Sequence, residues 1–477
     1  MIFSSVPFLF AFLPVVFAVT VAMRARFGRD GAVIALILAS IVFYLDWNPP
    51  DILYVIAIVV VNFWLVRGNL PPRAKVVLCV LLNGGYLLII KIAVSGGVNV
   101  GAKQTLEAFA LPLAISFVVF EQISYVVDRV ENRASRPRFL DYLFFVTFFP
   151  HLIAGPIVRY SNMIPQIYRR AFLRVSPTFL AVGFTYLAIG LAKKALIADP
   201  IARENQIFID FAGQLTPVEA WLNTFLYSFR IYFDFSGYAD MAVGLGYLFG
   251  IQLPMNFKSP YLATNIAQFW RRWHISLYRF FRDYIYLRLL RNSFFSEYSW
   301  AAVIVVIVIS SVWHGVGWGF AIWGLGHGAL LLLYRAYAGR RRRGEGVPSG
   351  LAAVMAFPPI AFAWRWICIG TTFFLVTILW IPFQAPDPTK AMLLLSSMTD
   401  VANFFHFTDL PVGDRHHLAM LLVGLVVVFL LPNSHQIALS ARTRFWPVAL
   451  AVVLFMSAVA PILVSSANPS RFVYFQF

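Results

Sequence analysis

Long apolar runs recur from one end of this chain to the other, and short basic turns separate them. Most runs have roughly the 17–25 residues with which an α-helix crosses the hydrocarbon core of a bilayer. They are continuous apolar blocks, whereas a transmembrane β-barrel shows alternating segments of about ten residues. The mean hydropathy is +0.76 and only 12% of residues are charged, against about 25% in soluble domains. The sequence therefore predicts an all-α polytopic membrane protein.

We expect roughly 11 transmembrane helices, since each crossing needs about 20 apolar residues. The first begins near Met1 and ends before Arg24, and because its positive charges follow the apolar run we interpret it as an uncleaved helix. Arg24 to Arg29 and Arg340 to Arg343 mark the cytoplasmic side, and both termini are expected outside. The later candidates are residues 31–46, 51–66, 75–94, 107–127, 175–194, 218–250, 299–313, 318–337, 352–384, 417–432 and 445–465.

Residues 140–158 interrupt the alternation of basic and neutral turns, because basic turns flank this apolar stretch on both sides. Its sequence contains Pro150, Gly155 and Pro156, which break a helix. We therefore expect a re-entrant segment that lines a cavity and does not cross the bilayer.

Charge and cysteine content narrow the class of protein further. The net charge is +17, but the basic residues are scattered among the turns, which favours contact with acidic lipids over nucleic acid binding. Cys79 and Cys368 both lie within apolar runs, so neither a disulfide framework nor a metal site is expected. We interpret residues 1–477 as one membrane domain, with N-terminal helices in 1–139, a core in 140–340 and C-terminal helices in 341–477.

Residues 268–291 have helical periodicity but are too charged for an ordinary span. Seven charged residues alternate with aromatic ones in QFWRRWHISLYRFFRDYIYLRLLR. One interpretation is a helix on the membrane surface with no chemical role. The other is the wall of a cytoplasmic funnel that attracts an anionic, phosphate-bearing ligand.

Three of the eight histidines lie in or beside these strongly apolar stretches. His327 lies in an apolar helix, one turn after Trp323 and among glycines that permit close backbone approach. It is either a buried histidine that hydrogen-bonds a neighbouring helix, or a neutral general base within the membrane. His314 precedes the glycines at 315, 317 and 319, so we expect it at a helix end in a supporting role.

Several motifs in a fixed order resemble the membrane-bound O-acyltransferase (MBOAT) family. They are LPLAISFVVFEQISYVVD (111–128), FFPHLIAGPIVRY (148–160), a long central motif that ends in FWRRWHISL (232–277), WHGVGWGFAIWGLGHG (313–328) and the closing FVYFQF. The resemblance is narrower to the bacterial branch that contains alginate O-acetyltransferase and teichoic-acid D-alanyl transferase. The chain departs from it at 117–120, where an aromatic-Thr-Phe run is usual, and at His151, where Gln is common.

The resemblance implies an MBOAT fold around a central funnel and roles for particular residues. His327 corresponds to the family's catalytic histidine, and His274 to a second active-site position that other branches fill with Asn or Asp. Tyr474 in the terminal motif corresponds to a tyrosine proposed to carry the acyl group. Candidate donor-binding residues are Arg271, Arg272, Trp273 and Trp323.

The resemblance also implies a route for the acyl group. A cytoplasmic thioester such as acetyl-CoA is the expected donor, with no bound cofactor. His327 would act as general base on Tyr474 while His274 polarises the thioester. An extracytoplasmic transferase of the SGNH or serine-esterase type would then place the acetyl group on an exopolysaccharide. The expected location is the bacterial inner membrane.

Two other classes of protein remain open at this point. A polysaccharide or lipid exporter could use histidines within the membrane as a proton relay. Against it stand the absence of an internal repeat and of evident acidic and basic pairs within the helices. The second alternative is a scaffold subunit without catalysis. The acceptor polymer and the acyl group are not specified by these patterns.

Overall fold

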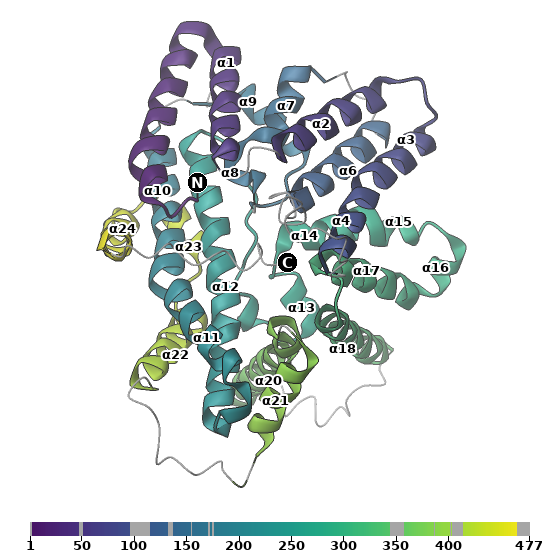
Figure 1. Cartoon of the computed structure of the whole chain (residues 1–477), viewed down its shortest axis with the longest axis vertical. Coiled ribbons are helices and arrows are strands. Elements are labelled where there is room, and N and C mark those ends of the chain that lie inside the picture. The colour runs from purple at the N-terminus through teal and green to yellow at the C-terminus, as the bar shows by residue number, and fades with distance from the viewer. Residues whose placement is uncertain are drawn as a thin grey trace, which may run out of the picture. The chain divides into compact units, whose positions relative to one another are not determined.

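The computed structural model describes residues 2–46, 51–95, 115–131, 137–153, 155–169, 172–173, 176–343, 357–385, 387–400, 402 and 414–464. Its regular elements in these ranges are all helices (Figure 1), as the apolar runs predict. The chain divides into two compact units. The first comprises Met1–Leu196, Asp234–Met255 and Ser434–Phe477, and the second comprises Ile197–Phe233 and Asn256–Asn433. These units are not the contiguous ranges into which we divided the sequence.

Among the described residues, five helices are long and apolar enough to cross a membrane, or six if one bent helix pair counts as a single span. They confirm a polytopic membrane protein. The count of 11 is not confirmed, partly because shorter apolar helices such as Val55–Arg67 and Ser299–His314 fall below the length required.

The first unit holds most of the N-terminal helices and the last two. They are η1 (Phe8–Phe12), α1 (Leu13–Leu45), α2 (Asp51–Arg67), α3 (Pro72–Cys79), η2 (Val80–Gly85), α4 (Tyr86–Ser95), α6 (Ile115–Glu131), α7 (Phe139–Thr147), α8 (Phe149–Leu152), α9 (Tyr160–Ile167), α10 (Pro177–Ala192), η4 (Lys193–Ala198), α23 (Ser434–Ser440) and α24 (Trp446–Val464). Two of the helices contribute to both units: η4 has its last two residues in the second unit, and α12 (Pro217–Leu248) has its residues from Asp234 onward in the first.

Helix α1 is interrupted at Gly28, which has φ +67° and ψ −155°. Glycine reaches this conformation without the steric cost that other residues meet. Figure 1 draws α1 as two arms joined by a sharp turn. The helical run Phe8–Leu45 has 38 residues, about 57 Å of helix, nearly twice the roughly 30 Å hydrocarbon core. The break therefore confirms that separate helices precede and follow the basic turn at Arg24 to Arg29.

Residues 140–158 do not form one long helix. Helix α7 ends at Thr147, α8 is a single turn, and residues 155–159 form no helix before α9 begins at Tyr160. Phe148 separates α7 from α8 with φ −56° and ψ 106°. The expected breaks in the helix are confirmed; that the segment is re-entrant and lines a cavity stays a prediction.

Four glycines bring α10 and α12 unusually close within the first unit. A Cβ on Gly190 would lie 2.5 Å from the carbonyl oxygen of Gly237, and a Cβ on Gly183 would lie 2.9 Å from that of Gly244. Both pairs repeat at a spacing of seven residues, so the same faces of the two helices meet over two turns. Small residues of this kind allow helices to pack in a membrane.

Two ion pairs lie beside this contact, one partly buried and one buried. Lys193 Nζ is 2.7 Å from Asp240 Oδ2 and 2.7 Å from Ser434 Oγ at the start of α23. Lys194 Nζ is 2.7 Å from Asp234 Oδ1, and both side chains are less than 7% exposed. The sequence-based argument that helices lack acidic and basic pairs is wrong, because the partners are about 40 residues apart and meet only when α12 packs on α10.

The second unit is built around α17 (Ser299–His314), α18 (Trp318–Arg342) and α20 (Pro358–Gln384). Its remaining elements are α11 (Asp199–Asp210), η5 (Ala212–Gln214), the first half of α12, η6 (Pro260–Leu262), α13 (Ile266–Trp270), α14 (Ile275–Phe280), η7 (Phe281–Tyr286), α15 (Leu287–Leu289), α16 (Ser293–Glu297), α21 (Pro388–Thr399) and α22 (Asp414–Phe429). Helix α20 is not split, because its first two prolines begin it and the third lies in its last turn.

Glycines of α18 determine how closely its neighbours pack. A Cβ on Gly324 would lie 1.8 Å from Ser311 Oγ of α17, and one on Gly326 would lie 2.3 Å from Leu379 Cδ2 of α20. Near the start of α18, a Cβ on Gly319 would lie 2.0 Å from the carbonyl oxygen of Pro382. The close backbone approach expected around His327 is confirmed.

Residues 268–291 differ from the single helix that their periodicity predicts. Helix α13 ends at Trp270, residues 271–274 form turns, and α14 begins at Ile275. Asn256 stabilises this break, since its backbone oxygen accepts a hydrogen bond from Ile275 N (2.9 Å) and its side-chain oxygen accepts one from Ser276 N (3.1 Å). These bonds satisfy backbone donors at the start of α14 that would otherwise have no partner.

Candidate active site

A cavity of about 740 Å³ lies in the second unit, among α13, α14, η7, α17 and α18. These elements gather in one region of Figure 1. This volume is within the range of small-molecule sites, about 300–1,000 Å³. Its lining residues are mainly aromatic and aliphatic, with three arginines among them: Arg271, Arg282 and Arg335. It is an apolar cavity with positive groups, suited to an elongated ligand that carries an anionic end.

His274 lines this cavity directly and is 1% exposed. It precedes α14 and has φ +43° and ψ +55°, a left-handed conformation. This conformation is uncommon outside glycine, although His, Asn and Asp adopt it more often than other residues. The turn ends α13 and redirects the chain, so that His274 begins a cavity-lining face that continues through Leu277, Tyr278, Phe281 and Arg282.

His327 lies behind the cavity wall and is completely buried. The indoles of Trp270 and Trp323 are both cavity-lining, and the centroid of each lies 5.0 Å from that of the His327 ring. Neither ring nitrogen of His327 has a hydrogen-bond partner within the described part of the chain. The structural alternative, a histidine that hydrogen-bonds a neighbouring helix, therefore has no support in these residues.

His314 is the last residue of α17, as its flanking glycines predict. Its ring centroid lies 4.8 Å from that of Trp323 and 4.6 Å from that of Trp313. Trp313 in turn lies 6.2 Å from His274. The three histidines thus belong to one aromatic cluster, in which tryptophans separate them.

The four candidate donor-binding residues occupy two kinds of position. Arg271 and Trp323 line the cavity. Trp273 is not among its lining residues, and its ring packs 5.3 Å from that of Trp380. Arg272 also lies outside the lining and donates hydrogen bonds to the carbonyl oxygens of Ser259 (3.4 Å) and Leu262 (3.3 Å). Burial, with the positive charges of Arg365 and Arg271, lowers the pKa of Arg272.

Sequence reasoning missed several lining residues, chiefly Trp270 and Arg335, whereas Arg282 belongs to the charged segment 268–291 that was expected to form a funnel wall. The sequence could have predicted Arg335 as a lining residue. One helix face continues from His327 at three- and four-residue spacings, through Leu331, Tyr334, Arg335 and Ala338. Trp270 gave no such signal, since its position against His327 depends on the break after α13. Tyr474 lies outside the described residues, as does the whole terminal motif.

Comparison of the sequence with those of known proteins shows to which family the chain belongs. Residues 86–380 match the model of the membrane-bound O-acyltransferase family. The chain belongs to that family. The chain is 31% identical to the peptidoglycan O-acetyltransferase of Helicobacter pylori, over all of this chain and 98% of that protein.

Two further relatives agree with this membership. The chain is 33% identical to the probable alginate O-acetylase of Azotobacter vinelandii, over 90% of this chain and 84% of that protein. It is 28% identical to the teichoic acid D-alanyltransferase of Bacillus subtilis, over 52% of this chain and 67% of that protein. This MBOAT protein is therefore an acyltransferase with several apolar helices in the membrane.

Proposed function

We propose that this MBOAT protein transfers an acetyl group from a cytoplasmic thioester, across the membrane, to an extracytoplasmic acceptor of a surface polysaccharide. The observation that carries the proposal is the position of the two histidines relative to the cavity. His274 lines the space in which a donor would lie, and His327 is separated from that space by two indoles that touch both. The named activities of the O-acetylating relatives support acetyl as the acyl group.

The donor enters the cavity with its anionic end toward the arginines. Arg271, Arg282 and Arg335 offer guanidinium groups that bind phosphate in a bidentate manner. Arg335 follows Trp323 by twelve residues on α18, about 18 Å along the helix axis. A phosphate near Arg335 would therefore leave room for an extended arm whose thioester reaches His274 and Trp323.

Acyl transfer requires a nucleophile, a base and a stabilised leaving group. The acceptor hydroxyl attacks the thioester carbonyl, its proton passes to His327, and the C–S bond breaks. The thiolate then takes that proton and leaves as a thiol. His274 lies on the donor side and hydrogen-bonds the carbonyl oxygen, on which negative charge develops.

Tyr474 is the proposed acceptor within this chain, with its hydroxyl as the group that attacks the thioester carbonyl. From Tyr474 the acetyl group passes to an extracytoplasmic SGNH-type or serine-esterase-like transferase, which places it on the polysaccharide. In this scheme the protein resides in a bacterial inner membrane with both termini outside, in agreement with the bias of basic residues.

The decisive experiment is transfer of labelled acetyl from acetyl-CoA by the purified protein. We expect label on Tyr474 when the extracytoplasmic partner is absent, and its loss in His327→Ala and in Tyr474→Phe. If His327→Ala folds and still transfers acetyl at the rate of the unaltered protein, the catalytic assignment is wrong. If Tyr474→Phe alone keeps full activity, only the acyl carrier is wrong.

Substitution of Trp270 tests whether its indole keeps water in the cavity away from His327. The Trp270 indole contacts both the cavity and His327. Trp270→Ala should therefore let water reach the His327 ring and lower the fraction of acetyl groups that pass from the donor to the acceptor. Trp270→Phe keeps a ring against His327 and serves as the matched variant. Hydrolysis of acetyl-CoA to free acetate, measured beside acetyl transfer, should rise in Trp270→Ala only.

A further inference from the structure

A second cavity lies in the first unit, where the turn of α1 meets the end of α9. Its volume is about 340 Å³, and it is lined by Arg24, Gly28, Arg29, Ile167, Tyr168 and Arg169. Three of these six residues are arginines and none is acidic. The lining comes from segments about 140 residues apart in the sequence. The arginines therefore surround a formed space, and they are not simply neighbours along one basic turn.

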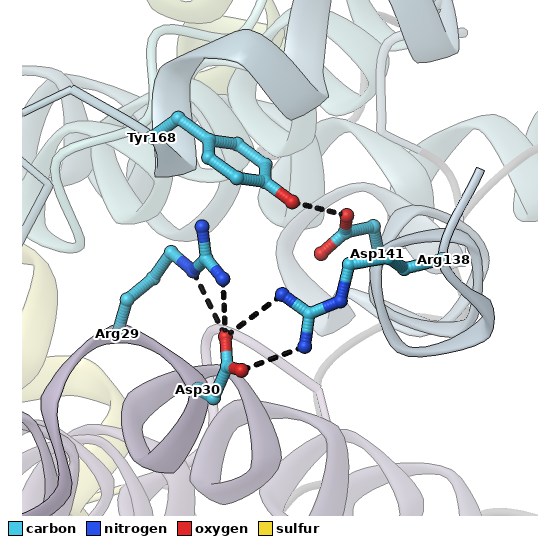
Figure 2. Close-up of polar contacts among 5 residues, drawn as sticks. All are labelled: Arg29, Asp30, Arg138, Asp141 and Tyr168. Atoms are coloured by element: carbon cyan, nitrogen blue, oxygen red, sulfur yellow. Dashed lines mark hydrogen bonds and ion pairs between the residues drawn. The ribbon is translucent and has the colours of Figure 1, made fainter. Parts of the chain in front are cut away.

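Arg29 is held in place on two sides, as Figure 2 shows. Its Nε and Nη2 donate hydrogen bonds to Asp30 Oδ1 at 2.9 and 2.7 Å. Its guanidinium carbon lies 4.0 Å from the centroid of the Tyr168 ring, within the range of a cation–π contact. A guanidinium already fixed in this way loses little conformational freedom when it binds an anion.

The charged side chains around this cavity have a net positive charge even when the nearby carboxylates are counted. Asp30 also accepts hydrogen bonds from Arg138, at 2.7 Å from Nη2 to Oδ2, so two guanidinium groups share one carboxylate. Tyr168 donates its hydroxyl proton to Asp141 Oδ2 at 2.6 Å, and burial together with this bond raises the pKa of Tyr168, which stays neutral. The cluster therefore has four arginines against two aspartates: Arg24, Arg29, Arg138 and Arg169 against Asp30 and Asp141.

The cavity lies at the end of two apolar helical arms, residues 13–27 and 29–45 of α1. A turn between such arms lies at the boundary between hydrocarbon and water, the depth of lipid phosphates. Apolar side chains of the first arm stay exposed beside it, with Phe27 61% and Val19 49% exposed. An anionic head group in the cavity would thus have an apolar surface next to it for its acyl chains.

We propose that this cavity binds the phosphate of an anionic phospholipid in the leaflet at the turn of α1. The bound phosphate accepts hydrogen bonds from Arg24, Arg29 and Arg169, and the acyl chains lie along the exposed face of α1 that includes Phe27. Basic pockets at helix ends bind acidic lipid head groups in this manner. The site belongs to the first unit, and its function does not depend on the proposed route of the acetyl group.

The test uses the full chain in nanodiscs of phosphatidylcholine that contain a little photoactivatable phosphatidylglycerol. In the unaltered protein, cross-links should map to peptides that contain residues 24–29 or 167–169. Unlabelled phosphatidylglycerol should compete, whereas added phosphatidylcholine or millimolar inorganic phosphate should not. The proposal is overturned if cross-links are found only in other peptides, or if phosphatidylcholine competes as well as phosphatidylglycerol does. Competition by inorganic phosphate would also overturn it, because the cavity would then be a site for soluble phosphate.

Variants measure the contribution of the arginines. The double substitution Arg24→Gln/Arg169→Gln should weaken apparent binding of phosphatidylglycerol about 25-fold, since one arginine near an anionic surface contributes about fivefold. Arg26→Gln is the matched control, because Arg26 is exposed in the same turn but does not line the cavity. Equal lipid binding by the double variant and the control refutes the site. If the double variant is not folded, the cross-link map of the unaltered protein decides alone.

Discussion

Gly319→Ala tests whether the packing of α18 on α20 determines the position of the active site. The Cβ of an alanine would lie 2.0 Å from the carbonyl oxygen of Pro382, and such contacts are not found below 3.0 Å. That oxygen belongs to the backbone and cannot rotate away, so the helices must separate by about 1 Å or more at this point. Gly319 precedes Trp323 by one turn and His327 by two turns on the same helix.

The expected effect follows from that displacement. A misplacement of 1 Å at a reacting centre can reduce the rate about 100-fold, and overpacking of this kind lowers the free energy of unfolding by about 1–3 kcal/mol. We expect kcat for acetyl transfer to fall about 10- to 100-fold, with a smaller change in KM because Arg335 lies sixteen residues further along α18 from the contact.

Steady-state acetyl transfer by purified protein and its thermal unfolding midpoint are the measurements. Gly370→Ala is the matched control, because Gly370 lies within α20 and a Cβ there meets nothing within 4 Å. It should keep both kcat and the midpoint. An unchanged kcat in Gly319→Ala, in protein that is folded, would show that the position of His327 does not depend on this contact.

Three further predictions concern other parts of the molecule. Gly190→Ala forces α10 away from α12, since its Cβ would lie 2.5 Å from a backbone oxygen, and should lower the unfolding free energy by about 1–3 kcal/mol; Gly85→Ala, with nothing within 4 Å, should not change the thermal midpoint as much. Asp234→Asn removes the charge opposite Lys194 at 2.7 Å and should destabilise the fold by about 3–5 kcal/mol; the pair Asp234→Leu with Lys194→Met should recover most of that loss in the same denaturation assay. Arg335→Gln should raise KM for acetyl-CoA about 10- to 150-fold with kcat nearly unchanged, because a hydrogen bond to a charged group contributes about 1.5–3 kcal/mol; a changed kcat with the same KM would place the donor elsewhere.

Much of the fold could be predicted, because the length of an apolar run and the basic turns beside it are visible in short stretches of sequence. The turn at Gly28, the lack of a span in 140–158 and the helix end at His314 all follow from glycine, proline and charge in the sequence. The break after α13 could not be predicted in this way. It depends on Asn256, whose oxygens bind Ile275 N and Ser276 N from almost 20 residues away, and periodicity within 268–291 contains no information about that contact.

In the candidate site, too, features set by nearby residues could be predicted and features set by distant contacts could not. Trp323 beside His327 follows from helical spacing, and the structure confirms it. The roles of adjacent residues in FWRRWH could not be distinguished, because the irregular turn sends Arg271 into the cavity and Arg272 toward the carbonyls of 259 and 262. The ion pairs of Lys193 and Lys194 were missed for a similar reason, since each partner lies on another helix.

The left-handed backbone of His274 limits which residues can replace it, whatever chemistry occurs there. Other branches of the family are expected to have Asn or Asp at this position, and His, Asn and Asp are the residue types enriched in this conformation. Exchange among these three during evolution would leave the turn intact while it changed the hydrogen-bonding group offered to the thioester. A mutagenesis series at 274 should therefore compare His with Asn, because His274→Ala changes the preferred backbone and the side chain together and cannot separate their effects.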